Sequence, residues 1–168
     1  MPAERKTLVE YPEVRIYAVE NVIGYKFADS MLCLKAIQVK HFINQFGNQA
    51  LVQLGDAALR LALCSAGYER YAYAEQILEV VDVKATNANL AKLGFPRKLN
   101  GYIIERESAE LGERSVATLV EALLSAVYVD CKGDMTTVKK VMETLDLCWK
   151  TEDLSRRGET SEGKSNSK

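Results

Sequence analysis

The segment from Leu51 to Leu59, L-V-Q-L-G-D-A-A-L, constrains the fold of this chain more than any other. Apolar residues recur around it every three or four positions, which predicts one long helix from about Gln49 to Tyr68. Gly55 lies inside that helix, where glycine costs about 1 kcal/mol relative to alanine. The sequence therefore predicts a close packing contact at Gly55. The apolar face of the helix would consist of Leu51, Leu54, Ala58, Leu61 and Ala62.

The same spacing continues through most of the chain and predicts an all-α fold. Further helices are expected over residues 14–23, 29–43, 73–81, 86–93, 115–129 and 135–149. The helix over 115–129 is the most apolar, and its face of Val116, Leu119, Leu123 and Val127 is expected to be almost fully buried. Residues 99–112 are expected to form a loop. These elements predict one domain over residues 14–149, between an N-terminal extension (1–13) and a polar, disordered tail (150–168).

Composition narrows the class of protein. The 168 residues are 48% apolar, which is enough for one domain with a core. A net charge of −1 gives no overall positive field, so any RNA-binding surface would be a local patch. Four cysteines without a CxxC pair (Cys33, Cys64, Cys131 and Cys148) are interpreted as reduced core residues, and a single histidine, His41, argues against a zinc site.

No targeting or membrane signal is recognised in the sequence. No apolar run approaches membrane-spanning length, and the N-terminus lacks the apolar core of a signal peptide. We therefore expect an intracellular protein without a membrane span. The sequence does not distinguish between cytoplasm, nucleus and mitochondrion.

Five stretches resemble, in order, the characteristic segments of the ribonuclease III family. They are residues 19–27, 31–39, 51–63, 85–91 and 115–130, and together they span about residues 14–147. The third is similar to the signature helix of the family, L-E-F-L-G-D-A-V-L, and the fifth to its second catalytic helix, D-a-l-E-A-l-i-G-A-i-Y-l-D. The resemblance implies an all-α nuclease domain that dimerises and cleaves double-stranded RNA. It also implies magnesium held by four carboxylates, two from each of these helices.

The chain keeps only half of the carboxylates that the resemblance implies. Asp56 and Glu121 stand at two of those positions, whereas Val52 and Thr118 replace the other two. Magnesium prefers oxygen ligands in an octahedron, so such a site would bind the ion weakly and place the attacking water poorly. We expect lost or strongly impaired cleavage. If activity remains, Asp56 and Glu121 would be the catalytic and metal-binding residues, with Mg²⁺ as the cofactor.

A structural interpretation of Asp56 stands beside the catalytic one. Arg60 lies one helical turn after Asp56 and would neutralise its charge. A buried pair of carboxylates without a metal is costly unless it is protonated or paired.

Partner surfaces follow from the same resemblance. The signature helix forms the two-fold dimer contact in the family, so Gln53, Leu54 and Ala57 are the candidate dimer residues. Gln53 stands where the family often has an aromatic residue that inserts into the partner. A homodimer is expected, and the effect of this substitution on it stays open.

Candidate RNA contacts lie around the fourth stretch. Lys84, Asn87, Asn89 and Lys92 offer cationic and amide groups that suit phosphate oxygens. The double-stranded-RNA-binding domain usual in the family is not expected in this chain, because the residues after the last predicted helix are few and polar.

Three functions remain open from sequence. The first is a non-catalytic domain that acts on structured or double-stranded RNA, in RNA processing or as an RNA scaffold. The second is an active, magnesium-dependent endoribonuclease that cleaves double-stranded RNA. The third is a helical protein-interaction domain, such as a structural protein of the mitochondrial ribosome.

Overall fold

The computed structural model describes residues 11–38, 48–104 and 111–155, which form helices joined by turns. In chain order these are α2 (Pro12–Ile23), α3 (Ser30–Ile37), α4 (Gln49–Glu69), α5 (Ala74–Lys84), α6 (Asn87–Gly94), the 3₁₀ turn η1 (Leu99–Tyr102), α7 (Glu113–Asp130), α8 (Met135–Thr144) and α9 (Glu152–Ser155). Within these ranges there is no β-strand, only an isolated bridge between Gln38 and Ile104. The predicted all-α fold is confirmed.

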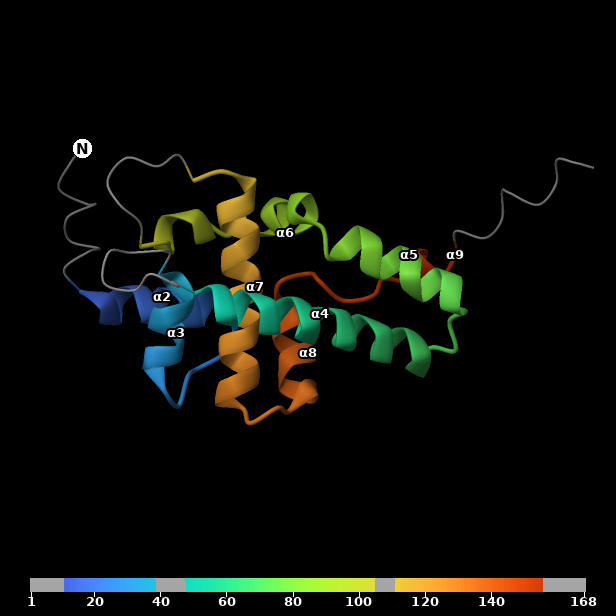
Figure 1. Cartoon of the computed structure of the whole chain (residues 1–168), viewed down its shortest axis with the longest axis horizontal. Coiled ribbons are helices and arrows are strands. Elements are labelled where there is room, and N and C mark those ends of the chain that lie inside the picture. The colour runs from blue at the N-terminus through green and yellow to red at the C-terminus, as the bar shows by residue number, and fades with distance from the viewer. Residues whose placement is uncertain (1–10, 39–47, 105–110, 156–168) are drawn as a thin grey trace, which may run out of the picture.

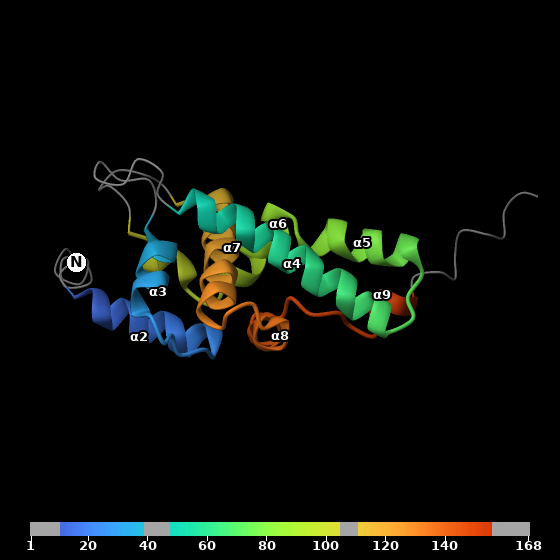
Figure 2. The same ribbon diagram turned by 60° about the horizontal axis from the view of Figure 1, so that its bottom comes forward.

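Helix α7 forms the centre of the core. It contacts α3, α4, α6 and α8, and α4 crosses it in Figures 1 and 2, with α2 and α3 on one side and α5 and α9 towards the far end of α4. The face of Val116, Leu119, Leu123 and Val127 is at most 1% exposed, as the sequence predicts. Every residue from Leu119 to Val127 is buried, so the middle of α7 is enclosed on all sides.

Local signals set the ends of the first two helices. Pro12 lies in the first turn of α2, where its fixed φ fits and its missing N–H is not needed. Gly24 ends α2 with a φ of 67°, a left-handed conformation that favours glycine. Asp29 caps α3, because its side chain accepts a hydrogen bond from the backbone N–H of Met31. The carboxylate of Asp130, at the end of α7, accepts a hydrogen bond from the Tyr25 hydroxyl (2.7 Å). This bond holds the loop between α2 and α3 against α7.

The helix that begins at Ser30 is shorter than predicted. It ends at Ile37 rather than near residue 43, because Gln38 is extended. The carbonyl oxygen of Ile37 accepts a hydrogen bond from the backbone N–H of Ile104 (2.8 Å), a tertiary contact that the helical spacing does not reveal. Residues 39–43 of the predicted helix lie outside the described residues.

The helix predicted over 135–149 is also wrong at its C-terminal end. Helix α8 stops at Thr144, and Asp146 has a left-handed φ of 62°. Trp149 therefore lies beyond the helix. Its indole is buried, and Nε1 donates a hydrogen bond to the carbonyl oxygen of Leu63 (2.9 Å) on α4.

Three further expectations need correction at the surface. Residues 152–155, placed in a disordered tail, form α9 and contact α5. Cys64 is exposed rather than a core residue, and Cys131 and Cys148 are half-buried. Leu54 and Leu61, expected on the buried face of their helix, are 37% and 55% exposed.

Helix α4 is the single candidate for a membrane span in the described ranges. It has the length for one, and its mean hydropathy reaches 1.2, which differs from the sequence expectation. Its contacts with α5, α7 and α8 account for this apolar composition, because a core helix needs the same residues.

Candidate functional site

The candidate site lies where α4 crosses α7. At the crossing, Gly55 touches the backbone of Glu121, and a Cβ added at Gly55 would overlap the carbonyl oxygen of Glu121. Only glycine allows two helix backbones to approach this closely. The close contact predicted for Gly55 is confirmed, and it brings the residue that follows, Asp56, to the side chain of Glu121.

One ridge of α4 carries the first half of the site. Val52, Asp56 and Arg60 are four residues apart and so lie on the same face. The Nε of Arg60 donates to both carboxylate oxygens of Asp56, at 2.9 and 3.0 Å. The two side chains are 46% and 38% exposed, so solvent screens the pair and it adds little to stability. The pair matters for the charge of the site, because the guanidinium of Arg60 offsets the negative charge of the Asp56 carboxylate.

Helix α7 carries the second half. Glu121 is only 8% exposed. Its pKa is raised from 4.5 to about 7, first by burial and then by the negative charge of Asp56, while the positive charge of Arg60 acts in the opposite direction. Glu121 is therefore partly protonated near neutral pH. Thr118, one turn earlier, is half-buried, and Ser125, one turn later, is fully buried with an unpartnered hydroxyl.

Comparisons with known proteins relate this chain to ribonucleases. No protein-family model matches the chain. It is 28% identical over 147 residues to the Ribonuclease 3 of Syntrophobacter fumaroxidans, which covers 80% of this chain and 60% of that protein. It is 27% identical over 141 residues to the Ribonuclease 3 of Helicobacter pylori, covering 80% and 58% of the two chains.

A solved structure matches over nearly its whole length. The nuclease domain of ribonuclease III from Campylobacter jejuni superposes with a TM-score of 0.70 and 19% identity, covering 78% of this chain and 96% of that one. The chain has the fold of a ribonuclease III nuclease domain. The resemblance seen in the sequence is confirmed. The chain spans about 60% of the length of the curated relatives, so the activity of the whole relatives does not follow from the match.

The residues present do not fit the magnesium site of a ribonuclease III. Val52 offers no donor atom and packs against the core. Asp56 is held by a guanidinium, and burial favours the protonated form of Glu121. Within the part of the chain that the structure describes, no three His, Cys, Asp or Glu side chains gather where they could hold a metal ion. Because magnesium needs several ionised oxygen ligands, this ribonuclease III-like site lacks the donor set.

The candidate dimer residues lie together on the outer face of α4. Gln53, Leu54 and Ala57 are all exposed. The face continues through Leu61, which the sequence assigned to the core, to Tyr68, which is 80% exposed. The buried side of α4 instead consists of Gly55, Ala58, Leu59, Ala62, Leu63 and Gly67. The two glycines on that side are the sequence signal for where α4 packs against its neighbours.

The candidate RNA contacts differ in accessibility. Lys84 is 9% exposed and pairs with Asp153. Asn89 is half-buried, and its Nδ2 donates to the carbonyl oxygen of Lys84 (2.9 Å). Asn87 and Lys92 are exposed. The structure thus leaves Asn87 and Lys92 open to a ligand and places Lys84 inside an internal ion pair.

Proposed function

We propose that this chain is a ribonuclease III-like domain that binds structured or double-stranded RNA and has lost, or nearly lost, the ability to cleave it. One observation carries the proposal. At the crossing of α4 and α7, the two retained carboxylates are bound or neutralised by the protein itself, since Asp56 pairs with Arg60 and Glu121 is buried. Val52 and Thr118 supply no carboxylate to replace them.

An alternative is an active, magnesium-dependent endoribonuclease. It is favoured by the proximity of Asp56 and Glu121, which is close enough for one charge to shift the pKa of the other. A metal ion would then have to displace Arg60 and deprotonate Glu121 before it could be held by two carboxylates. Each step opposes binding, so the non-catalytic function is the better supported of the two.

The partner in this proposal is a second copy of the chain. The outer face of α4 presents Gln53, Leu54, Ala57, Leu61 and Tyr68 to solvent. The mostly apolar row on this exposed helix face, with Leu54, Leu61 and Tyr68, is the pattern of a helix–helix contact. The Campylobacter jejuni nuclease domain, which has the same fold, contains a region involved in dimer formation, and this supports a second copy of the chain as the partner. The double variant Leu61→Glu, Tyr68→Glu places charges on this face. We expect it to be a monomer in sedimentation experiments.

Cleavage of a long duplex RNA tests the proposed loss of catalysis. Purified protein is assayed with magnesium and then manganese, beside Asp56→Ala and Glu121→Ala. We expect no cleavage at high protein concentration, with binding of the duplex retained. Metal-dependent cleavage that both substitutions abolish would establish the endoribonuclease instead.

Restoring the missing carboxylates sharpens this test. The triple variant Val52→Glu, Thr118→Asp, Arg60→Ala adds two ligands and removes the competing cation. We expect it to gain magnesium-dependent cleavage, because the donor set then suits the ion. Arg60→Ala alone is the matched control and is expected to stay inactive.

Salt dependence separates RNA binding from a protein-interaction domain with no role in RNA. Contacts to phosphates release counterions, so affinity for a duplex falls steeply as salt rises. We expect such a decline, with loss of affinity in Lys92→Gln. An absence of duplex binding at low salt would favour the protein-interaction domain.

A further inference from the structure

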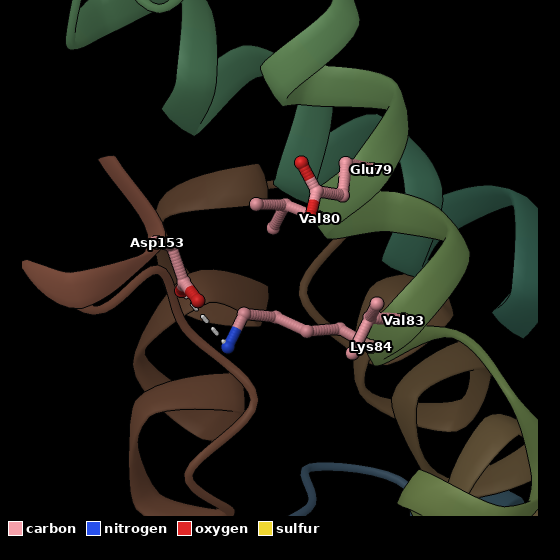
Figure 3. Close-up of a pocket in the computed structure, with 5 residues that line it drawn as sticks. All are labelled: Glu79, Val80, Val83, Lys84 and Asp153. Carbon is pink, nitrogen blue, oxygen red and sulfur yellow. Dashed lines mark ion pairs between the residues drawn. The ribbon is translucent and has the colours of Figure 1, made fainter. Parts of the chain in front are cut away.

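The contact between α5 and α9 contains the most buried ion pair of the described residues. The Nζ of Lys84, the last residue of α5, lies 3.1 Å from Oδ2 of Asp153, and both side chains are 11% exposed (Figure 3). Lysine is rarely buried to this extent without a partner. Val80 and Val83 line the same small pocket beside the pair. Asp153 thus provides the anion that Lys84 needs at this place.

The segment that carries Asp153 is a short helix at the end of the described chain. Helix α9 has four residues, which is too short to be stable on its own. Apart from the ion pair, Gln76 Nε2 donates to the carbonyl oxygen of Leu154 (3.3 Å). Leu154 itself is exposed and adds no buried side chain. The pairing of Lys84 with Asp153 is thus a largely buried ion pair that joins α9 to α5.

Lys84 ends α5, three residues before Asn87 begins the helix α6 that holds the open RNA candidates. Asn89 binds the carbonyl oxygen of Lys84, and Asn87 and Lys92 lie exposed on the adjoining helix α6. A carboxylate oxygen and a phosphate oxygen make the same charge-assisted hydrogen bond with an ammonium group. In its docked position, the carboxylate of Asp153 occupies the place that a phosphate oxygen would take at Lys84.

We propose that α9 is an autoinhibitory strap whose Asp153 occupies a phosphate subsite at Lys84, and that duplex RNA displaces it. This inference rests on the proposed RNA binding and adds a control element to it. Docked, the strap neutralises Lys84 and leaves the RNA surface with fewer cations. Displaced, it frees Lys84 for one phosphate. Because α9 is tethered to the domain, it competes at a high local concentration, and the apparent affinity for RNA is lowered accordingly.

Duplex binding by the full chain tests the strap. Asp153→Asn keeps the shape of the side chain and removes the charge that holds Lys84. We expect it to bind duplex RNA about three- to tenfold more tightly, since the competing anion is lost. The slope of log affinity against log salt should steepen by about 0.9, the value of one added phosphate contact.

Two matched variants separate this effect from a general change in charge. Glu152→Gln removes the same charge from the neighbouring residue of α9 and is expected to change affinity much less. In a Lys84→Gln background, Asp153→Asn should give no gain. Equal gains in Asp153→Asn and Glu152→Gln would reduce the effect to net charge and overturn the proposal. If the unmodified chain binds RNA and Asp153→Asn does not change that binding, the strap alone is rejected. If neither binds RNA, the proposed function fails as well.

A measurement on the unmodified protein guards against an unstable variant. Hydrogen exchange of the backbone over residues 150–155 should become faster when duplex RNA is added, because α9 leaves its site. Exchange that stays the same or slows in the RNA complex would overturn the displacement.

Discussion

The two charged clusters of this domain are built in opposite ways. Asp56 and Arg60 are one turn apart on α4, and both side chains are more than a third exposed. Lys84 and Asp153 come from α5 and α9, and both are largely buried. A local pair forms wherever its helix forms, whereas a pair between distant segments forms only when both are docked. The first cluster therefore sets charge at the candidate site, and the second contributes to how the chain is held together.

The largest expected effect comes from the crossing on which the first cluster depends. Gly55→Ala places a Cβ onto the backbone of Glu121, so α4 and α7 must move apart. Overpacking usually costs about 1–3 kcal/mol and can cost more when backbone is in the way, so we expect a loss of about 3 kcal/mol or more in the free energy of unfolding. Urea denaturation measures it.

Gly101→Ala is the matched control for this substitution. A Cβ at Gly101 would meet no atom within 4 Å, and its backbone needs no left-handed conformation. We expect a change within about 0.5 kcal/mol. Equal effects at the two glycines would show that the crossing is not close-packed.

The second largest loss of stability is expected at the buried pair of Lys84 and Asp153. Lys84→Ala leaves the carboxylate of Asp153 largely buried, with a hydrogen bond from the backbone N–H of Lys150 but no cation, and removing one member of a buried pair is costly. Because the short helix α9 can leave its site and return the charge to water, we expect about 1–3 kcal/mol rather than the full cost. The double variant Lys84→Ala, Asp153→Ala should recover part of it in a thermal unfolding series.

The pH dependence of stability reports on Glu121. Its pKa in the folded protein is raised to about 7, above the 4.5 of the unfolded chain, because burial disfavours the ionised form. The unfolded state thus loses its proton first, and stability falls as the pH rises from about 4.5 to 7. In urea denaturation, we expect the stability of Glu121→Gln relative to the natural chain to be greater at pH 8 than at pH 4, by up to about 3 kcal/mol. Parallel pH profiles of the two proteins would contradict this account.

The smallest effect is expected at the exposed pair. Arg60→Ala should change the free energy of unfolding by less than about 0.5 kcal/mol, since solvent screens both partners. It should nevertheless raise the pKa of Glu121, because Arg60 is the group that lowers it. A loss as large as that of Lys84→Ala would remove the contrast between the clusters.

Much of the candidate site could be predicted because its parts are local. The spacing of Val52, Asp56 and Arg60 places them on one face of any helix, and the same holds for Thr118 and Glu121. The conformational cost of Gly55 indicated a close contact before any partner was known. The caps at Asp29 and Gly24 likewise lie where their side chains, or the lack of one, favour them.

Errors occurred where a distant segment decided the outcome. The helix from Ser30 ends at Ile37 because Ile104 bonds to its last carbonyl group. Trp149 was assigned to a helix, but its indole instead reaches the carbonyl oxygen of Leu63. In each case the competing partner lies far away in the chain, where hydrophobic spacing carries no information.

The sequence by itself determined that the chain is all-α, that α4 and α7 carry the residues resembling a ribonuclease III, and that Val52 and Thr118 stand where the resemblance implies carboxylates. These properties depend on residue type and on a repeat of three to four residues. Only the tertiary structure decided that Glu121 is buried against Gly55, that the outer face of α4 is left open, and that Lys84 is held by Asp153. Burial and pairing between distant segments depend on which surfaces meet, and short-range spacing does not specify that.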